Sequence, residues 1–491
     1  MKKLLLAVFS IATTFSLYAQ REVPQERMEQ IYEEVKTPYK YGLAVAPADN
    51  YHKIDCPTVF RQGDKWLMTY VVYNGKGGTD GRGYETWIAE SDNLLEWRTL
   101  GRVLSYRDGK WDCNQRGGFP ALPDMEWGGS YELQTYKGRH WMTYIGGEGT
   151  GYEAVKAPLY VGLAWTKGDI STAHEWESLD KPILSIHDKD AQWWEKLTQY
   201  KSTVYWDKDK TLGAPFVMYY NAGGRHPETD LKGERVGIAL SKDMKTWKRY
   251  SGNPVFAHEA DGTITGDAHI QKMGDVYVMF YFSAFEPSRK YKAFNTFAAS
   301  YDLVNWTDWK GADLIIPSKN YDELFAHKSY VVKHDGVVYH FYCAVNNAEQ
   351  RGIAIATSKP MGRSAVRFPE PEIKNRRQII ELNEGWKTWR VENGKLRVES
   401  EKTVNIPHNW DDYYGYRQLT HGNLHGTVLY KKDFTLNNSQ FSTLNSQLKK
   451  YFLRFEGVGT YATITVNGKD FGRHPIGRTT LTLDVTDELK Q

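Results

Sequence analysis

The chain has 491 residues, which is enough for two or three domains of ordinary size. It carries 63 basic and 60 acidic residues, and part of its formal net charge of +3 lies at the N-terminus, so the remainder is nearly neutral. This balance excludes the one-faced basic surface of a nucleic-acid-binding protein. The three cysteines, Cys56, Cys113 and Cys343, have no metal-ligand spacing, and they allow one disulfide whose members the sequence does not identify.

The first residues have the layout of a secretory signal peptide. Lys2 and Lys3 precede an apolar run over 4–17, and the small residue Ala19 follows it. The alternative, an N-terminal membrane anchor, needs about 20 apolar residues, and this run is shorter. No cysteine follows the run to carry a lipid. We therefore predict a signal peptide over 1–19 and a periplasmic or secreted protein that does not insert into a membrane.

A short helical lead-in is predicted over 20–38. Met28, Ile31 and Val35 are spaced three and four residues apart, which places them on one face of a helix. We expect this helix to bury that face and to lead into the first repeat of the domain that follows.

Aromatic residues are abundant, with 17 Trp, 33 Tyr and 19 Phe, and many of them recur in one repeated phrase. Each copy has a polar start, a short alternating strand, a turn with Gly or Asp, and an aromatic-rich strand. This pattern predicts a β-hairpin, whose pleated surfaces favour aromatic side chains. The five copies lie at 55–71, 130–145, 201–221, 267–282 and 328–343.

A second phrase, in which Ser is followed by Asp or Asn and then by Trp, comes after the first. It is clearest at 91–98, 241–248 and 300–307, each time after a third predicted strand. Ser and Asp side chains close tight turns by hydrogen bonding to the backbone. Because both phrases recur in the same order, a sandwich of unrelated hairpins is disfavoured. Five repeats of about four strands predict an all-β, five-bladed β-propeller over 39–366.

The sequence changes character after a Pro-rich, charged linker at 367–385. Residues 386–491 alternate apolar and polar positions, as strands of a β-sandwich do, and Asn467-Gly468 is typical of a type I′ hairpin turn. A polar, Ser/Asn-rich stretch at 437–450 is predicted to be a mobile loop.

These motifs resemble known families. The blade count, the Ser–Asp–Trp turns and the start of the first repeat at 55–59 resemble the glycoside hydrolase family 43 group and its five-bladed relatives, families 32, 117 and 130. Residues 386–491 resemble the jelly-roll-like sugar-binding β-sandwich of family 2 glycoside hydrolases, either as a sugar binder or as a brace. That family usually has closing strands after the segment matched by 484–490, so we expect a truncated sandwich or one closed by another strand.

Aligning the five repeats predicts which side chains meet at the propeller axis, where the inner strands begin. The outer ring is Asp55, Gly129, Tyr200, Gly266 and His327. The next is Cys56, Ser130, Lys201, Asp267 and Lys328, and a third is Thr58, Glu132, Thr203, His269 and Tyr330. Charged groups at such positions are costly unless they are hydrated or paired. We therefore predict a funnel that binds a polar ligand.

Hydrolysis of a glycoside needs two carboxyl groups, a proton donor and a base or nucleophile. The resemblance to family 43 implies that Asp55 is the base. Glu132 and Asp267 are the candidates for the acid, because blade three offers no carboxylate at the aligned positions; Asp124 and Glu126 are reserves. Asp55 as a strand cap and Glu132 as a solvated edge residue are the structural alternatives.

Further candidates would bind substrate. They are His269, His327, Lys201, Lys328, Arg351, Trp87 and Trp127. The two lysines either pair with Asp55 or Asp267, lowering the pKa of the carboxyl group, or hold an anionic sugar. His327 resembles the family 43 histidine near an axial Ca²⁺ or water, so it is also a candidate metal ligand, with a structural role as the alternative. No other cofactor is expected.

The sequence therefore predicts an exo-acting glycoside hydrolase that releases a terminal sugar from a plant or algal polysaccharide or oligosaccharide by inversion. One alternative is a phosphate-dependent glycoside phosphorylase, in which Lys201 and Lys328 hold phosphate. The other is a non-catalytic glycan-binding propeller, which the missing blade-three carboxylate favours. The expected partner is a carbohydrate; the oligomeric state is not predicted.

Overall fold

The computed structural model describes residues 22–75, 81–152, 158–370, 379–410, 426–435, 450–475, 477 and 479–489. The chain divides into two compact units, Met1–Lys374 and Asn375–Gln491, and each is described by itself. The predicted signal peptide at 1–19 lies outside the described residues. None of the described helices is long and apolar enough to cross a membrane.

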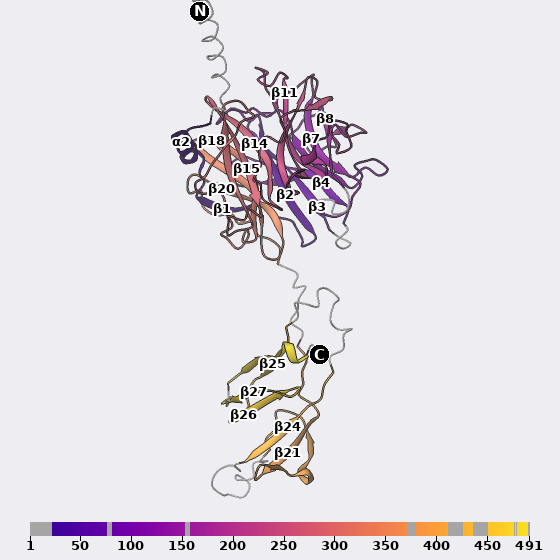
Figure 1. The fold of residues 1–491 in the computed structure, drawn as a ribbon, viewed down its shortest axis with the longest axis vertical. Coiled ribbons are helices and arrows are strands. Elements are labelled where there is room, and N and C mark those ends of the chain that lie inside the picture. The colour runs from indigo at the N-terminus through magenta and orange to yellow at the C-terminus, as the bar shows by residue number, and fades with distance from the viewer. Residues whose placement is uncertain are drawn as a thin grey trace, which may run out of the picture. The chain divides into compact units, whose positions relative to one another are not determined.

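The first unit is a β-propeller of antiparallel blades, each numbered outward from its inner strand (Figure 1). Blade one contains β2 (His52–Gln62), β3 (Lys65–Asn74), β4 (Gly83–Ser91) and β5 (Arg98–Leu104). Blade two contains β6 (Gln115–Pro120), β7 (His140–Gly147), β8 (Tyr160–Thr166) and β9 (Glu177–Ser178). Blade three contains β10 (Thr198–Trp206), β11 (Phe216–Arg225), β12 (Lys232–Ser241) and β13 (Trp247–Arg249), preceded by the short 3₁₀ helix η3 (Trp193–Glu195).

Blades four and five complete the ring. Blade four contains β14 (Ile264–Met273), β15 (Val276–Ala284), β16 (Ala293–Ser300) and β17 (Thr307–Asp308). Blade five contains β18 (Phe325–His334), β19 (Val337–Val345), β20 (Arg351–Thr357) and, as its outer strand, β1 (Tyr39–Val45). Most strand residues are buried, because each blade packs its two faces against its neighbours. The five-bladed, all-β prediction is confirmed.

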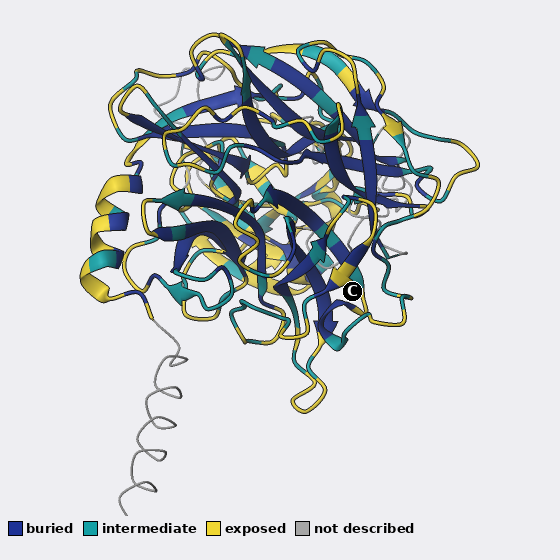
Figure 2. Ribbon diagram, turned by 90° about the horizontal axis from the view of Figure 1, so that it is seen from above, coloured by how far each residue is buried: buried dark blue, intermediate teal, exposed yellow. Residues whose placement is uncertain are grey.

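The N-terminal strand closes the ring. β1 pairs with β20 in antiparallel register, with Leu43 opposite Ala354. The helix α2 (Gln25–Val35) that precedes β1 buries Met28, Ile31 and Val35 as its spacing predicts, and Figure 2 shows it outside the blades with one buried and one exposed side. The prediction that this helix leads into blade one is wrong. It leads into blade five, because that blade lacks an outer strand from its own end of the chain.

The Ser–Asp–Trp phrase forms the turn between the third and fourth strands of a blade. In blade three the Ser241 hydroxyl accepts a hydrogen bond from the Met244 amide at 3.0 Å, and the Asp243 carboxylate accepts one from Thr246 at 2.7 Å. The Trp247 indole then donates to the Met244 carbonyl at 2.7 Å. The predicted mechanism of the turn, side-chain bonding to the backbone, is confirmed.

Blade two departs from the predicted alignment. Its inner strand is β6 (Gln115–Pro120), whereas the repeat copy at 130–145 contributes only isolated bridges before it enters β7. Glycines explain why the strand was missed, since a β-carbon on Gly118 would lie 2.4 Å from the sulfur of Met142. A strand that needs glycine for close packing shows no alternation of apolar and polar residues.

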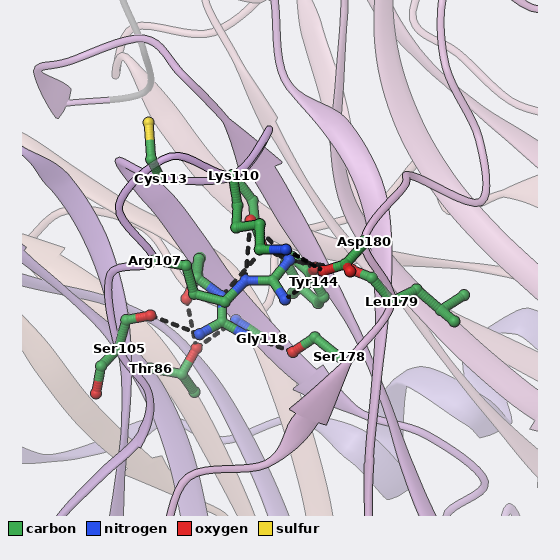
Figure 3. A network of polar contacts seen from close by, with 12 residues as sticks. Thr86, Ser105, Arg107, Lys110, Cys113, Gly118, Tyr144, Ser178, Leu179 and Asp180 are labelled. Atoms are coloured by element: carbon green, nitrogen blue, oxygen red, sulfur yellow. Dashed lines mark hydrogen bonds and ion pairs between the residues drawn. The ribbon is translucent and has the colours of Figure 1, made fainter.

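The start of β6 is fixed by a buried ionic network. Arg116 and Asp112 are fully buried, and the Arg116 Nε lies 3.1 Å from an Asp112 oxygen. Asp112 also accepts hydrogen bonds from Arg107 at 2.8 Å and from the Tyr144 hydroxyl at 2.8 Å. Arg107, Tyr144 and Ser178 are among the side chains that converge here (Figure 3). The network joins β6, β7 and the loops beside them.

The second unit consists of small antiparallel sheets. Its elements are β21 (Trp386–Glu392), β22 (Lys395–Leu396), η4 (Val398–Ser400), β23 (Lys402–Val404), β24 (Thr427–Lys431), β25 (Phe452–Phe455), β26 (Ala462–Val466), β27 (Lys469–His474), β28 (Leu481–Asp484) and α4 (Thr486–Leu489). Asn467 and Gly468 join β26 to β27 with φ angles of 46° and 87°, which is the backbone of the predicted type I′ turn. The predicted mobile loop at 437–450 lies outside the described residues except for its last residue. The resemblance of this unit to family 2 stays a prediction.

Candidate active site

Four of the five inner strands carry a β-bulge at the same place. The register shifts lie between Asp55 and Thr58, Gln199 and Ser202, Gly266 and His269, and His327 and Tyr330. Three residues at these bulges, Cys56, Asp267 and Lys328, have left-handed φ angles of 51°, 57° and 61°. Bulges re-aim side chains, and strained backbone collects at functional sites. The sequence alignment had placed these residues in one ring, together with Lys201.

The strand starts surround a pocket to which all five blades contribute. Its lining is Cys56, Tyr84, Phe119, Ile145, Tyr200, Lys201, Asn221, Glu234, Ile264, Asp267, Phe282, Ala284, Phe285, Phe325, His327, Lys328 and Arg351. The volume is about 160 Å³, roughly ten times what a single buried water requires. A mostly apolar wall with a few convergent charged groups is typical of a small-molecule site.

Asp55 lies behind the pocket wall and is fully buried. Its Oδ2 accepts hydrogen bonds from the Lys328 ammonium at 2.7 Å and from the Tyr152 hydroxyl, and the Arg351 guanidinium lies 3.6 Å away. Burial alone would raise the pKa of Asp55, but the positive charges of Lys328 and Arg351 outweigh it and hold the pKa well below its usual range. Asp55 is therefore a stable carboxylate that fixes two pocket-lining cations.

Asp267 lies in the pocket wall and is only 3% exposed. The Lys201 ammonium is 3.5 Å from its Oδ2, which is too long for a strong hydrogen bond, and this oxygen has no hydrogen-bond partner among the described residues. Burial raises the pKa of Asp267, and the neighbouring cations Lys201 and Lys328 only partly offset this. A buried carboxyl group with a raised pKa is suited to donate a proton.

Glu234 is a pocket-lining carboxylate that the sequence alignment missed. It lies on the third strand of blade three, β12, and is only partly buried. Its Oε2 accepts a hydrogen bond from the Asn221 amide at 3.1 Å, and the Asn221 oxygen in turn accepts one from the Asp267 backbone amide at 3.3 Å. The parallel bridge between Glu234 and Ile264 brings blades three and four together here. The pocket thus holds a second carboxylate beside Asp267.

The local sequence contained a signal for Glu234. Gly223 pairs with Glu234, and Gly224 pairs with Gly233, so small residues clear the space in front of this part of β12. Isolated glycines in a strand often mark the close approach of a ligand or backbone. Attention to inner strands alone overlooked a carboxylate carried by a third strand.

The axial metal implied by the family 43 resemblance does not fit the residues present. Asp55, His327 and Cys343 are buried and each offers an atom within 4.8 Å of the others. Calcium takes about six to eight oxygen ligands, whereas His327 and Cys343 offer nitrogen and sulfur, and Lys328 already neutralises the carboxylate. Burial lowers the pKa of His327 to about 3, so its ring is neutral in the pocket wall. All three cysteines are free thiols.

Glu132 lies far from the pocket. It is exposed and bridges Arg61 near the end of β2, six residues and roughly 20 Å along the strand from Asp55. The reserve candidates Asp124 and Glu126 belong to the same loop, in which Glu126 bridges Lys272 near the end of β14. This displacement follows from the misalignment of blade two.

The other predicted binding residues divide in the same way. Lys201, His327, Lys328 and Arg351 line the pocket. His269 is buried beneath it, stacked on Tyr330 with ring centroids 3.8 Å apart. The Trp127 indole donates to Glu34 of α2 at 2.8 Å, and Trp87 packs against the buried apolar cluster of blades one and five. Neither Trp87 nor Trp127 lines the pocket, so both are placed as packing residues.

Comparison with known proteins bears on this site. No protein-family model matches the chain. A curated "Beta-glucuronidase" of Formosa agariphila is 28% identical over 123 residues, which cover 24% of this chain and 11% of that protein. The chain thus spans about a tenth of the length of the curated relative it matches.

Two solved structures are much more similar. One is described as "Glycoside hydrolase" and the other as a complex of BT0996 with RGII. Each is 96% identical, with a TM-score of 0.71, and covers 72% of this chain and 100% of its own. Membership of family 43 itself stays a prediction. A relative of this identity, matched over its whole length, together with the two-carboxylate pocket, shows that the chain belongs to the glycoside hydrolases.

Proposed function

We propose that the propeller removes a terminal sugar from the glycan RGII. The observation that carries this proposal is the pocket at the axis, which is walled by all five blades and backed by the buried pair of Asp55 and Lys328. A pocket of about 160 Å³ that is closed by such a pair receives the end of a glycan rather than its middle. The identity of the glycan is taken from the 96% identical structure that is described as a complex with RGII.

Glu234 and Asp267 are the proposed catalytic pair. Asp267, whose pKa is raised by burial, donates its proton to the glycosidic oxygen as the bond from that oxygen to the anomeric carbon breaks. Glu234 accepts a proton from a water molecule whose oxygen forms the new bond to the anomeric carbon. Exchange with solvent then returns a proton to Asp267 and removes one from Glu234. Inversion is kept as predicted from the family 43 resemblance.

Asp55 has a different role in this proposal from the one that the family 43 resemblance implies. A carboxylate with a strongly lowered pKa is a weak base, so it is poorly suited to activate water. Asp55 instead positions Lys328 and Arg351, which line the pocket and can donate hydrogen bonds to sugar hydroxyl or carboxylate groups.

The test is incubation of the purified protein with RGII, with and without inorganic phosphate. We expect release of one free sugar at a rate independent of phosphate, and proton NMR of the first product should show the inverted anomer. A sugar 1-phosphate as product would establish the phosphorylase alternative. Binding of RGII without release of sugar would establish the non-catalytic alternative.

A further inference from the structure

One aromatic residue at the pocket mouth has an unusual backbone. Phe285 lines the pocket, is 50% exposed and has a φ angle of 58°. A bulky side chain in the left-handed region is a conformational outlier, and such outliers persist only where the surroundings enforce them. The hydrogen bond from the Phe285 amide to the Lys292 carbonyl, at 2.8 Å, fixes this conformation at the start of the β15–β16 loop.

Packing does not explain the choice of Phe at this position. Among the described residues with left-handed φ, the other large apolar and aromatic ones are buried: Leu94, Leu122, Tyr131, Met244 and Leu303. The exposed ones are polar or charged, as at Lys137, Lys210 and Glu349. Phe285 alone in this described set is both aromatic and half open to solvent. A glycine would relieve the backbone and remove exposed apolar surface, so the ring is retained for some other purpose.

The surroundings of Phe285 form an aromatic wall. Its ring meets the edge of Phe325 at a centroid distance of 6.0 Å and an angle of 81°. Cations lie over the Phe325 ring, with Lys292 at 5.7 Å and the Arg351 guanidinium at 5.9 Å. These contacts hold the wall in place and leave the exposed side of Phe285 available to a ligand.

The position of Phe285 along β15 relates it to the proposed chemistry. Phe282 pairs with Gly266, the neighbour of Asp267. Phe285 follows three residues later, roughly 10 Å farther along the strand, and so lies outward of the carboxyl groups. A ring there faces the part of the glycan that leaves, not the sugar held between Glu234 and Asp267.

We propose that Phe285 is a stacking platform for the sugar next to the one released, on the leaving-group side of the cleaved bond. This proposal rests on the proposed function, because it assumes a glycan end in the pocket. The apolar face of a sugar ring covers the exposed face of the phenyl ring and removes both from water. The platform sets affinity for the glycan and leaves the bond-breaking step itself to the carboxyl groups.

The test compares Phe285→Gly with Phe285→Trp and with Lys210→Gly as the matched control. Lys210 is exposed, has a φ angle of 56° and lies outside the pocket. Affinity for RGII is measured by calorimetry with each change placed in a Glu234→Gln background, so that the glycan is not consumed. Thermal unfolding is measured for the single variants.

We expect both glycine variants to melt at a higher temperature than the wild type, because each removes left-handed strain. Phe285→Gly should weaken binding at least tenfold, Phe285→Trp should bind within about threefold of the parent, and Lys210→Gly should bind equally well. Equal affinity with and without the ring would overturn the platform, and so would a lower melting temperature for Phe285→Gly. Failure of the wild type to hydrolyse RGII would count against the proposed function alone, since affinity is measured separately.

Discussion

Two buried ionic clusters lie at the starts of inner strands, and they differ in how completely their charges are paired. In blade two, Asp112 accepts hydrogen bonds from Arg107 and Tyr144 and forms an ion pair with Arg116. In the pocket, one oxygen of Asp267 has no hydrogen-bond partner among the described residues, and the Lys201 ammonium lies 3.5 Å from it. Both carboxyl groups are almost fully buried.

The comparison separates charges that hold the fold from charges kept for a ligand. A buried carboxylate surrounded by donors stabilises the elements that supply them, and its loss leaves an uncompensated cation. A buried carboxyl oxygen without a donor costs free energy in the empty protein. It is tolerated at a pocket wall because a substrate can supply the missing partner. Substitutions in the two clusters should therefore affect different measurements.

The largest effect is expected for Glu234→Gln. Removing one member of an acid–base pair should lower kcat/KM for RGII by about 10²- to 10⁴-fold, while the melting temperature stays within a few degrees of the wild type. Glu132→Gln is the matched control, because Glu132 is exposed and far from the pocket, and its kcat/KM should be unchanged. Equal losses in the two variants would break the distinction between the two ends of the inner strands.

The next effect is on stability, for Asp112→Asn. This change leaves the fully buried Arg116 without its close carboxylate, and should lower the free energy of unfolding by about 3–5 kcal/mol. Denaturant unfolding measures it. At temperatures where the variant is folded, kcat/KM for RGII should match the wild type. Loss of activity without loss of stability would make the two clusters alike.

A smaller, pH-dependent effect is expected for Asp55→Asn, about 1.5–3 kcal/mol at pH 7. The folded protein holds the pKa of Asp55 below its unfolded value, so the unfolded chain binds more protons in acid. The stabilisation is therefore fully present above the unfolded pKa of about 3.9 and is lost as the pH falls from there toward the folded pKa. Unfolding curves at pH 7, 5 and 3 should show the variant approaching the wild type only at the lowest pH. A constant difference would contradict the ionic role of Asp55.

Much of the fold was visible in the sequence because four blades repeat the same hairpin phrase. The same repetition placed Lys201, Asp267 and Lys328 in one ring, which the bulges of the inner strands bear out in position. Blade two was misread because the glycine-rich β6 has no alternation, whereas the loop copy at 130–136 imitates the phrase without forming an inner strand.

Two features depended on contacts distant in sequence. The spacing of Met28, Ile31 and Val35 predicted the helix α2, but only the pairing of β1 with β20 shows which blade it serves. Glu234 could not be placed from the repeats, because its approach to Asp267 depends on the bridge between blades three and four. Side chains on inner strands follow from repeat alignment, whereas those brought in by neighbouring blades do not.

The most direct test of this account is to measure both the activity and the stability of Asp267→Asn. The amide cannot donate the proton that the carboxyl group donates, so we predict a loss in kcat/KM for RGII of at least about 100-fold. The free energy of unfolding at pH 7 should change far less than in Asp112→Asn, because one oxygen of Asp267 has no donor to lose among the described residues. Full activity, or a loss of stability equal to that of Asp112→Asn, would contradict the claim that the buried carboxyl group of the pocket serves catalysis.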